Sequence, residues 1–387
     1  MAGLNPGSAG RVLVLNAGSA TLKATVLDLP EETLRFERTI DWSATAPPAE
    51  RRAAIDSVLD AAVAGGVESD TIEIVAHRVV HGGERFTAPT VVDDDVVDAL
   101  DGLADLAPLH NPSGVATIRV ARERLPAVPH VASFDTAFHA TLPVVARRYP
   151  VPDDWGRDHG IRRYGFHGLS VDWSVGRAAA LLERPVSELR LVVAHLGGGC
   201  SVTAVEGGRS IDTSMGLTPL EGLMMGTRAG SIDPGIVFRL LRAGLSPDEV
   251  ERRLEHESGL VGVAGTADMR RLVERSAAGD ARATMAIALF VRRAAAGIAA
   301  AATTLPTLDA VVFTGGIGEG AASVRTAICE RLGSFGVPIP PAVRIDDGEP
   351  DAVVADAGAD DVAVLRVHAR EDLVMARGAL TAVTIRP

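Results

Sequence analysis

The stretch RVLVLNAGSATLK at residues 11–23 decides the fold of this chain. It predicts a short apolar strand at Val12–Leu15, a tight turn that contains Gly18, and a second strand at Thr21–Leu27, which together form a β-hairpin. The stretch LVVAHLGGGCSVTAV at residues 191–205 repeats this pattern around three glycines. Glycine lets backbone N–H groups approach an anion closely, so two such hairpins favour a site that grips a chain of phosphates.

A third glycine-rich segment, at residues 315–318, follows the predicted strand Ala310–Thr314 and is predicted to form a turn that leads into a helix at Ala321–Leu332. Residues 316–321 formally match the G-x-G-x-x-[GA] fingerprint, which is typical of an NAD-dependent dehydrogenase. Only residues 322–387 remain after this match, which is too few to complete a Rossmann half. The strand–glycine–helix unit therefore favours a nucleoside site that serves phosphoryl transfer.

The composition excludes several classes of protein. The chain has 387 residues, 47% of them hydrophobic, which is enough for two domains with a sizeable core. A net charge of −12 repels nucleic-acid phosphate, so no nucleic-acid partner is expected. The apolar segment Met285–Leu305 contains Arg292 and Arg293 and predicts a buried helix, not a membrane span. Cys200 and Cys329 lack metal-type spacing and the N-terminus lacks a signal-peptide core, so we expect a soluble cytoplasmic protein.

Strand and helix patterns are mixed along the chain, which is typical of an α/β protein. Further strands are predicted at Ile72–Ala76, Val128–Phe134 and Val362–Val367. A proline-rich polar stretch at residues 143–160 is the predicted domain boundary. Each side of it carries one glycine hairpin near its start, so we predict a duplicated architecture with the ligand in a cleft between the two domains.

Single charged residues stand at predicted strand ends and in shaped loops, and each has a structural alternative. Arg78 is suited to bind carboxylate or phosphate in a bidentate fork, or to close a salt bridge. Asp135 is suited to Mg²⁺ or substrate, or to cap a helix. His167 and Arg228 lie in glycine-flanked loops, where a purely structural role is the alternative. Glu371 precedes a predicted helix, whose dipole it could simply offset.

Taken together, these residues resemble the acetate kinases, within the superfamily of acetate and sugar kinases, Hsp70 and actin. The resemblance spans nearly the whole chain and implies a two-domain α/β protein with a duplicated ribonuclease H-like (actin-like ATPase) fold and an interdomain cleft. It places the N-terminal domain at residues 1–148, joined by a C-terminal helix at about 372–387, and the nucleotide-binding domain at 149–371. The matching stretches, in family order, are VLVLNAGSATLK, AHRVVHGGERF, LAPLHNPSG, FDTAFHATLP, YGFHGLS, HLGGGCSVTAVEGG, TSMGLTPLEGLMMGTRAGSIDP and VVFTGGIGE.

The resemblance also implies roles for residues at matching positions. Those expected to be catalytic are Arg78, Asp135, His167 and Arg228. Those expected to bind Mg²⁺ (or Mn²⁺) are Asn16 and Glu371. Those expected around the methyl group and carboxylate of acetate are Arg78, Val80, Leu109, Phe166 and Pro219. Those expected around ATP or ADP are Ser19, Thr21, Lys23, His195, Gly197, Gly198, Gly199, Asp268, Met269, Arg270, Gly316, Ile317 and Gly318. His167 is expected to stabilise the transition state, with His110 and His195 as supporting histidines.

A carboxylate acceptor has a pKa of about 4–5 and is already ionised at pH 7, so no general base is required. The expected reaction is direct in-line transfer between ATP and acetate, giving acetyl phosphate and ADP, with Asp135 in an orienting role. Propionate or butyrate is the alternative acceptor. Gly198 and Gly320 stand where the family has asparagine, so pyrophosphate or another nucleotide stays open as the donor. The resemblance further implies a homodimer.

Overall fold

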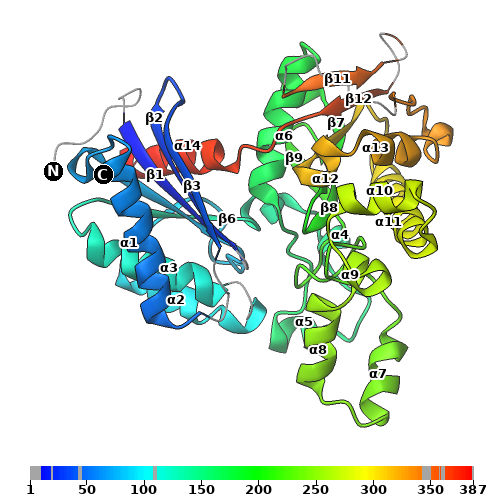
Figure 1. The fold of residues 1–387 in the computed structure, drawn as a ribbon, viewed down its shortest axis with the longest axis horizontal. Coiled ribbons are helices and arrows are strands. Elements are labelled where there is room, and N and C mark those ends of the chain that lie inside the picture. Colours follow the sequence, from blue (N-terminus) through cyan, green and yellow to red (C-terminus); the bar gives the residue numbers. More distant parts are fainter. Residues whose placement is uncertain are drawn as a thin grey trace. The chain divides into compact units, whose positions relative to one another are not determined.

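The computed structural model describes residues 10–18, 21–41, 46–107, 111–341, 350–356, 358 and 362–385. The chain divides into two compact units, the first made of residues 1–140 and 370–387 and the second of residues 141–369 (Figure 1). The predicted boundary at 143–160 falls just inside the second unit. Thr141 and Arg147 explain this, because the Thr141 hydroxyl donates to Ser210 O (3.1 Å) and Arg147 O accepts from Arg163 N (2.7 Å), both within that unit.

The first unit is a mixed six-stranded sheet with the order β3-β2-β1-β4-β6-β5. Strands β1, β4 and β6 are parallel, and β2, β3 and β5 pair antiparallel with their neighbours. Its helices and strands are β1 Gly10–Ala17, β2 Thr21–Leu29, β3 Thr33–Asp41, α1 Pro48–Ala64, β4 Ile74–Val79, β5 Thr90–Val91, α2 Asp94–Asp101, α3 Asn111–Arg124, β6 His130–Phe134 and α14 Glu371–Thr384.

Helices cover both faces of this first sheet, which is why β1 is apolar on both of its faces. One core cluster joins Leu13 and Leu15 of β1 to Ile55 and Val58 of α1, with α3 contributing Val120. Helix α14 packs against β1, β4 and β6. The two layers bury the sheet completely at its centre and leave the strand ends as the place where polar groups can gather.

The second unit is also a mixed six-stranded sheet, with the order β11-β12-β10-β7-β8-β9. Strands β7, β10 and β12 are parallel, and β8, β9 and β11 pair antiparallel. Its helices and strands are α4 Val144–Arg147, α5 Asp153–His159, α6 Gly168–Leu181, β7 Arg190–Leu196, β8 Cys200–Glu206, β9 Arg209–Thr213, α7 Pro234–Arg242, α8 Pro247–His256, α9 Gly259–Ala264, α10 Met269–Ala277, α11 Ala281–Ala302, β10 Ala310–Thr314, α12 Gly315–Gly320, α13 Ala322–Cys329, β11 Ala352–Ala355 and β12 Ala363–Arg366.

The two sheets have the same topology. Each starts with three antiparallel strands in chain order, then adds two strands parallel to the first and one short antiparallel edge strand. Strand β7 thus corresponds to β1, β10 to β4 and β12 to β6. The predicted duplication of architecture is confirmed, and equivalent strand ends in the two units carry the glycine-rich or charged motifs.

The glycine-rich segment after β10 differs from its prediction as a turn, because residues 315–320 form the short helix α12 and α13 begins only at Ala322. Glycine is a poor helix former, so the segment needs tertiary support. Arg325 supplies it, because its buried guanidinium donates through Nη1 to the carbonyls of Gly318 (2.7 Å) and Glu319 (2.8 Å) at the end of α12. A side chain from the next helix therefore satisfies backbone groups that the local sequence leaves open.

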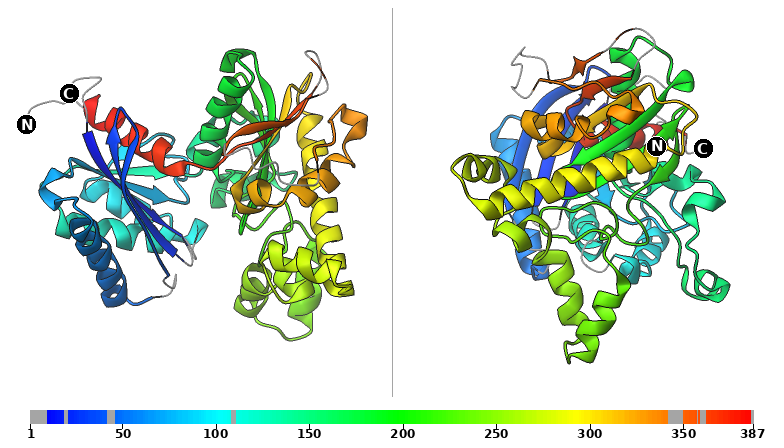
Figure 2. Two further views of the ribbon diagram at one scale, coloured as in Figure 1. Left: turned by 45° about the horizontal axis from the view of Figure 1, so that its top comes forward. Right: turned by 90° about the vertical axis from the view of Figure 1, so that its right-hand side faces the viewer.

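Helix α11 corresponds to the predicted buried helix, but one side of it is exposed at Met285 (57%) and Leu289 (36%). Within the part of the chain that the structure describes, it is the one helix long and apolar enough to cross a membrane by length and composition. It packs against α9, α10 and α13 and against β7 and β8, as a core helix of a globular unit does (Figure 2). Packing explains its apolar character.

Two buried histidines form a pair inside the first unit. His77 on β4 and His130 on β6 are stacked, and His77 Nε2 lies 2.9 Å from His130 Nδ1. His130 Nε2 lies 3.1 Å from Leu125 O and must donate to it, so His130 Nδ1 accepts and His77 Nε2 donates. Burial, with the nearby charge of His130 and Arg122, lowers the pKa of His77 well below 6.5. Burial also lowers the pKa of His130.

The histidine pair predicts an acid-sensitive fold. A histidine held neutral in the folded state favours unfolding once the pH falls below the unfolded pKa, because the unfolded chain then takes up more protons. We expect His77→Gln, which keeps a donor toward His130 but does not titrate, to lose about 1.4 kcal/mol less stability than wild type between pH 7.5 and 5.5. Urea unfolding at both pH values measures this difference. Identical losses in the two proteins would contradict the assignment.

Candidate active site

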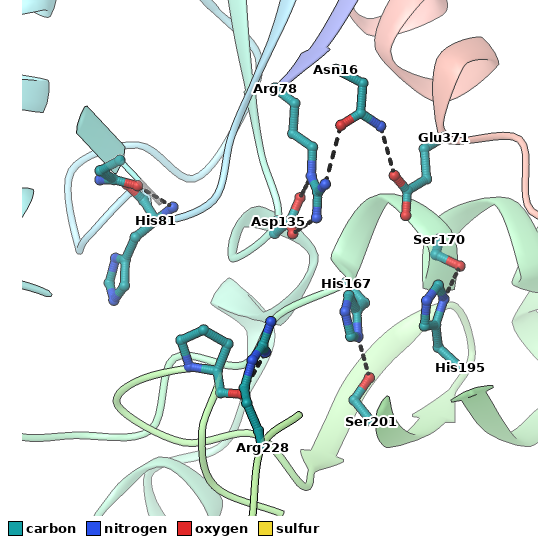
Figure 3. A network of polar contacts seen from close by, with 12 residues as sticks. Asn16, Arg78, His81, Asp135, His167, Ser170, His195, Ser201, Arg228 and Glu371 are labelled. Atoms are coloured by element: carbon teal, nitrogen blue, oxygen red, sulfur yellow. Dashed lines mark hydrogen bonds and ion pairs between the residues drawn. The ribbon is translucent and has the colours of Figure 1, made fainter. Parts of the chain in front are cut away.

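Four predicted residues of the first unit form one connected network at the carboxyl ends of its parallel strands. Arg78 donates to Asp135 in a bidentate pair, from Nε to Oδ1 at 2.8 Å and from Nη2 to Oδ2 at 2.6 Å. Arg78 Nη1 also donates to Asn16 Oδ1 at 3.1 Å, and Asn16 Nδ2 donates to Glu371 Oε2 at 3.1 Å. Figure 3 shows these contacts running from Asp135 through Arg78 and Asn16 to Glu371.

The sheet explains why these four residues meet. Strands β1, β4 and β6 are parallel neighbours, so Asn16, Arg78 and Asp135 reach the same edge, and Glu371 begins α14 beside them. Burial alone would lower the pKa of Arg78, but the charges of Asp135 and Glu371 raise it above its ordinary value. Arg78 therefore does form a salt bridge at a strand end, which was the structural alternative to a binding role. This salt bridge orients the guanidinium.

The turn after β4 is held by helix α3. Asn111 is fully buried, and its carboxamide binds the backbone of His81. Its Oδ1 accepts from His81 N (3.0 Å) and its Nδ2 donates to His81 O (2.9 Å). Val80, predicted for the methyl pocket, lies in this turn and is buried. Three other predicted residues, Ser19, Leu109 and His110, lie outside the described residues.

The β1–β2 hairpin forms as predicted. Its register pairs Asn16 with Lys23, and Gly18 N donates to Thr21 O at 2.8 Å. The Lys23 ammonium lies 2.9 Å from Glu37 on β3, with a side chain that is 41% exposed. Such a partly exposed pair is weak, so Lys23 is held only loosely in this position.

In the second unit, two predicted histidines stack on one another. The rings of His167 and His195 have centroids 4.2 Å apart. His167 Nδ1 lies 2.9 Å from the Ser201 hydroxyl, and His195 Nδ1 lies 2.8 Å from the Ser170 hydroxyl (Figure 3). His167 has φ = 57°, in the left-handed region that a non-glycine residue rarely adopts. Both Nδ1 atoms are engaged by serines that the sequence did not single out.

Gly199 sits between His167 and Arg228, so the β7–β8 turn meets two predicted catalytic residues. A Cβ added at Gly199 would lie 2.9 Å from His167 Nε2 and 3.8 Å from Arg228 Nη1, so any other residue there would displace the His167 ring. A Cβ added at Gly197 would lie 3.6 Å from Gly316 N, which brings this turn beside helix α12, with Ile317 and Gly318 buried behind it. Gly198 is exposed, with open space around it.

Arg228 is held by contacts that its loop sequence does not reveal. Its Nη1 donates to Pro219 O at 2.9 Å and its Nε lies 3.3 Å from Glu255 Oε2. Glu255, on α8, is nearly buried, and burial raises the pKa of its carboxyl although Arg228 opposes the shift. Phe166 and Pro219, both predicted for the methyl pocket, are buried in this unit.

The three residues predicted to contact adenosine lie at the start of α10. Asp268 caps the helix, accepting through Oδ1 from Arg270 N (2.9 Å) and Arg271 N (3.3 Å). Met269 is buried, and Arg270 is exposed. The carboxylate of Asp268 therefore has a structural task, and the side chains of Asp268 and Arg270 are both exposed.

Glu319 was missed by sequence reasoning. Its carboxylate accepts from His368 Nδ1 at 2.6 Å and from Ala369 N at 3.1 Å. These contacts tie α12 to the segment that follows β12, two residues before Glu371. The motif GGIGE was visible in the sequence, but nothing local indicates that its glutamate binds a backbone amide 50 residues later in the chain.

Comparisons with known proteins show which family this chain is similar to. The model of the Acetokinase family matches residues 11–377. An acetate kinase from Deinococcus deserti is 46% identical, covering 94% of this chain and 96% of its own. Among solved structures, a propionate kinase from Francisella tularensis aligns with a TM-score of 0.87 at 33% identity, covering 96% of this chain and 99% of its own. Porphyromonas gingivalis acetate kinase aligns with a TM-score of 0.86 at 30% identity, covering 97% and 100%.

The duplicated sheets and the glycine hairpin at the first strand of each define a two-domain α/β protein with the actin-like fold. The match to the family model and the identity with its members extend over nearly all of the chain. This chain belongs to the Acetokinase family.

Proposed function

We propose that this protein transfers the terminal phosphoryl group of ATP to acetate, giving acetyl phosphate and ADP, and also catalyses the reverse reaction. Support comes from its relatives, since proteins 42–46% identical to this chain are named acetate kinases. The observation that carries the proposal is the network Asp135–Arg78–Asn16–Glu371. It presents at one edge of the first sheet a guanidinium that is fixed by Asp135, with the Glu371 carboxylate connected to it through Asn16.

The chemistry explains why such a site needs cations. The acceptor carboxylate and the polyphosphate are both anions, so repulsion between them is the main obstacle to in-line attack. We assign Arg78 and Arg228 to neutralising the acceptor and the transferring phosphoryl group, and His167 to donating toward its equatorial oxygens. Asp135 orients Arg78 through the bidentate pair and is not needed as a base, because the acceptor is already ionised.

The residues present fit a magnesium ion that is held mainly by substrate. Mg²⁺ commonly uses one or two carboxylates together with substrate phosphates and water. The Asp135 carboxylate is engaged by Arg78 on both oxygens, which leaves Glu371, with the carboxamide of Asn16, as the group to hold the ion or its water shell. An ion held there would offset the negative charge of the phosphates.

Propionate is a second candidate acceptor, because one similar solved structure is a propionate kinase. The apolar residues assigned to the methyl group, Val80, Phe166 and Pro219, are all buried. One methylene changes binding in an apolar pocket by about 1–3 kcal/mol, so the preference between acetate and propionate depends on small differences in pocket size.

A coupled kinase assay that crosses acetate, propionate and butyrate with ATP, GTP and pyrophosphate tests the proposal. We expect the highest kcat/KM for acetate with ATP, and activity that depends on added Mg²⁺. A higher kcat/KM for propionate would move the assignment to the second candidate. Absence of transfer to any carboxylate from any donor would contradict the proposal.

We further propose a cytoplasmic homodimer. The thiols of Cys200 and Cys329 are free and buried, which suits a reducing compartment. Helix α7 exposes Ile236 (45%) and Phe238 (56%), apolar side chains that a second copy could cover. Sedimentation should give twice the chain mass, and Phe238→Glu should shift the protein toward the monomer while Arg239→Glu on the same helix does not. A monomeric wild type would contradict this.

A further inference from the structure

The segment Ser214–Gly222, here called the acceptor loop, contacts the predicted acceptor-side residues of the second unit. Its Gly216 carbonyl accepts from Tyr164 N (3.0 Å) and Gly165 N (3.4 Å), which directly precede Phe166 and His167. Its Pro219 carbonyl accepts from Arg228 Nη1 at 2.9 Å. The positions of His167, Phe166 and Arg228 therefore depend on how firmly this loop is held.

Two side chains from outside the acceptor loop, Arg163 and Tyr149, hold it, partly through the loop's own Glu221. Arg163 donates through Nη1 to the carbonyls of Ser214 (3.1 Å) and Met215 (3.0 Å), and through Nη2 to Glu221 Oε1 (2.8 Å). Tyr149 accepts from Leu217 N at 3.1 Å and donates its hydroxyl to Glu221 Oε2. The Arg163 guanidinium also lies over the Tyr149 ring, 5.3 Å from its centroid. Both oxygens of Glu221 are thus bound, one by each partner.

Gly216 packs closely against the side chains of Tyr149 and Glu221. A Cβ added at Gly216 would overlap Glu221 Oε2 and the Tyr149 hydroxyl oxygen, so any other residue there would displace the two side chains from the loop. Burial raises the pKa of the Tyr149 phenol, so it stays protonated and continues to donate. A partly buried carboxylate that is bound on both sides is a fixed point in the loop.

We propose that Tyr149, Arg163 and Glu221 form a positioning network for the acceptor side of the active site. The network touches neither substrate nor the reacting atoms in this assignment, and it acts by fixing the loop that carries Pro219 and supports Arg228 and His167. The inference rests on the proposed function, since it takes these three as acceptor-side residues. The glycines at 197–199 and 315–318, in contrast, are assigned to the side of the active site that binds the phosphoryl donor.

Kinetics of Tyr149→Phe, Glu221→Gln and Arg163→Lys test the inference. We expect kcat/KM for acetate to fall by up to about 10²-fold, the effect of a displacement near 1 Å, while KM for ATP stays within about twofold. Arg163→Lys should lose activity although it keeps the positive charge, because an ammonium cannot bind two carbonyls and a carboxylate in one plane. Glu206→Gln, which removes a carboxylate paired with Arg190 at 3.5 Å in the same unit, is the matched control and should behave as wild type.

Thermal unfolding of each variant separates positioning from general damage. A variant with a lowered Tm but unchanged constants for both substrates would overturn the inference, as would equal rises in KM for acetate and ATP. If the wild type is active and the variants have the same kinetic constants, the inference would also be overturned, while the proposed function would stand. A wild type unable to phosphorylate any carboxylate would refute the proposed function and the inference together.

Discussion

Arg228→Ala is expected to lower kcat by about 10³–10⁵-fold at saturating acetate and ATP, the range known for loss of an arginine that stabilises a phosphoryl transition state. In the folded protein this guanidinium is fixed by Pro219 O at 2.9 Å and by Glu255 at 3.3 Å. Its charge is therefore in place before the reaction begins, and its loss removes stabilisation made chiefly in the transition state. Steady-state rates at saturating concentrations of both substrates measure the effect.

Two variants separate this prediction from other causes. Arg253→Ala removes an exposed arginine of α8 whose side chain is 53% accessible, and it should leave kcat unchanged. Arg228→Ala also removes the neighbouring charge that holds down the pKa of Glu255, so burial should raise that pKa further. Glu255→Gln in the Arg228→Ala background removes the buried carboxylate and should restore stability but not kcat. Near-full turnover of Arg228→Ala would contradict the assignment.

A double-mutant cycle tests whether Arg78 and Arg228 act on the same phosphoryl group. Groups that act as one unit give effects that do not multiply, because the first loss already removes most of what the second supplies. We therefore expect Arg78→Ala together with Arg228→Ala to lower kcat by much less than the product of the two single effects. Fully multiplicative effects would mean that the two arginines serve separate steps.

The strand skeleton could be predicted from the sequence because buried parallel strands are continuous apolar runs. Residues Val12–Leu15 and Ala310–Thr314 are buried on both faces, and their patterns are unambiguous. Strand β3 at Thr33–Asp41 was missed because it is an edge strand with mostly exposed, polar residues, and β5 is only two residues long. Short or exposed strands depend on their neighbours for pairing, so local sequence carries little signal for them.

Residues of the candidate site could be predicted from the sequence where they belong to a recognisable motif, and not where they depend on tertiary contacts. Arg78, Asp135, Asn16 and Glu371 are connected in the structure, although Glu371 is 355 residues from Asn16 in the chain. Glu255 and the pair Tyr149–Glu221 carry no local pattern, because their partners are supplied by the fold. Helix α12 was read as a turn for the same reason, since buried Arg325 supports it from the next helix.

The pair formed by Arg78 and Asp135 predicts an unequal loss of stability on removing either partner. Asp135 is nearly buried, with 2% of its side chain accessible, whereas 17% of Arg78 is accessible. Removing one partner of a buried ion pair costs about 3–5 kcal/mol, because the other charge stays desolvated. Arg78→Ala takes the guanidinium away from the more deeply buried carboxylate, so it should reach the upper part of that range. Asp135→Ala leaves Arg78 beside Asn16 and Glu371 and should cost less.

Urea unfolding of the single and double variants checks this order. The double variant Arg78→Ala/Asp135→Ala should be more stable than Arg78→Ala alone, because the desolvated carboxylate is gone. Activity adds a second test, since Asp135→Asn should lower kcat without removing any acidic limb of its pH profile if Asp135 only orients Arg78. If that limb vanished in Asp135→Asn, the carboxylate would be accepting a proton in the reaction, and the claim that an ionised acceptor needs no base would fall. If instead Asp135→Ala proved the less stable single variant, the orienting pair would have to be reassigned, with Asp135 serving groups other than Arg78.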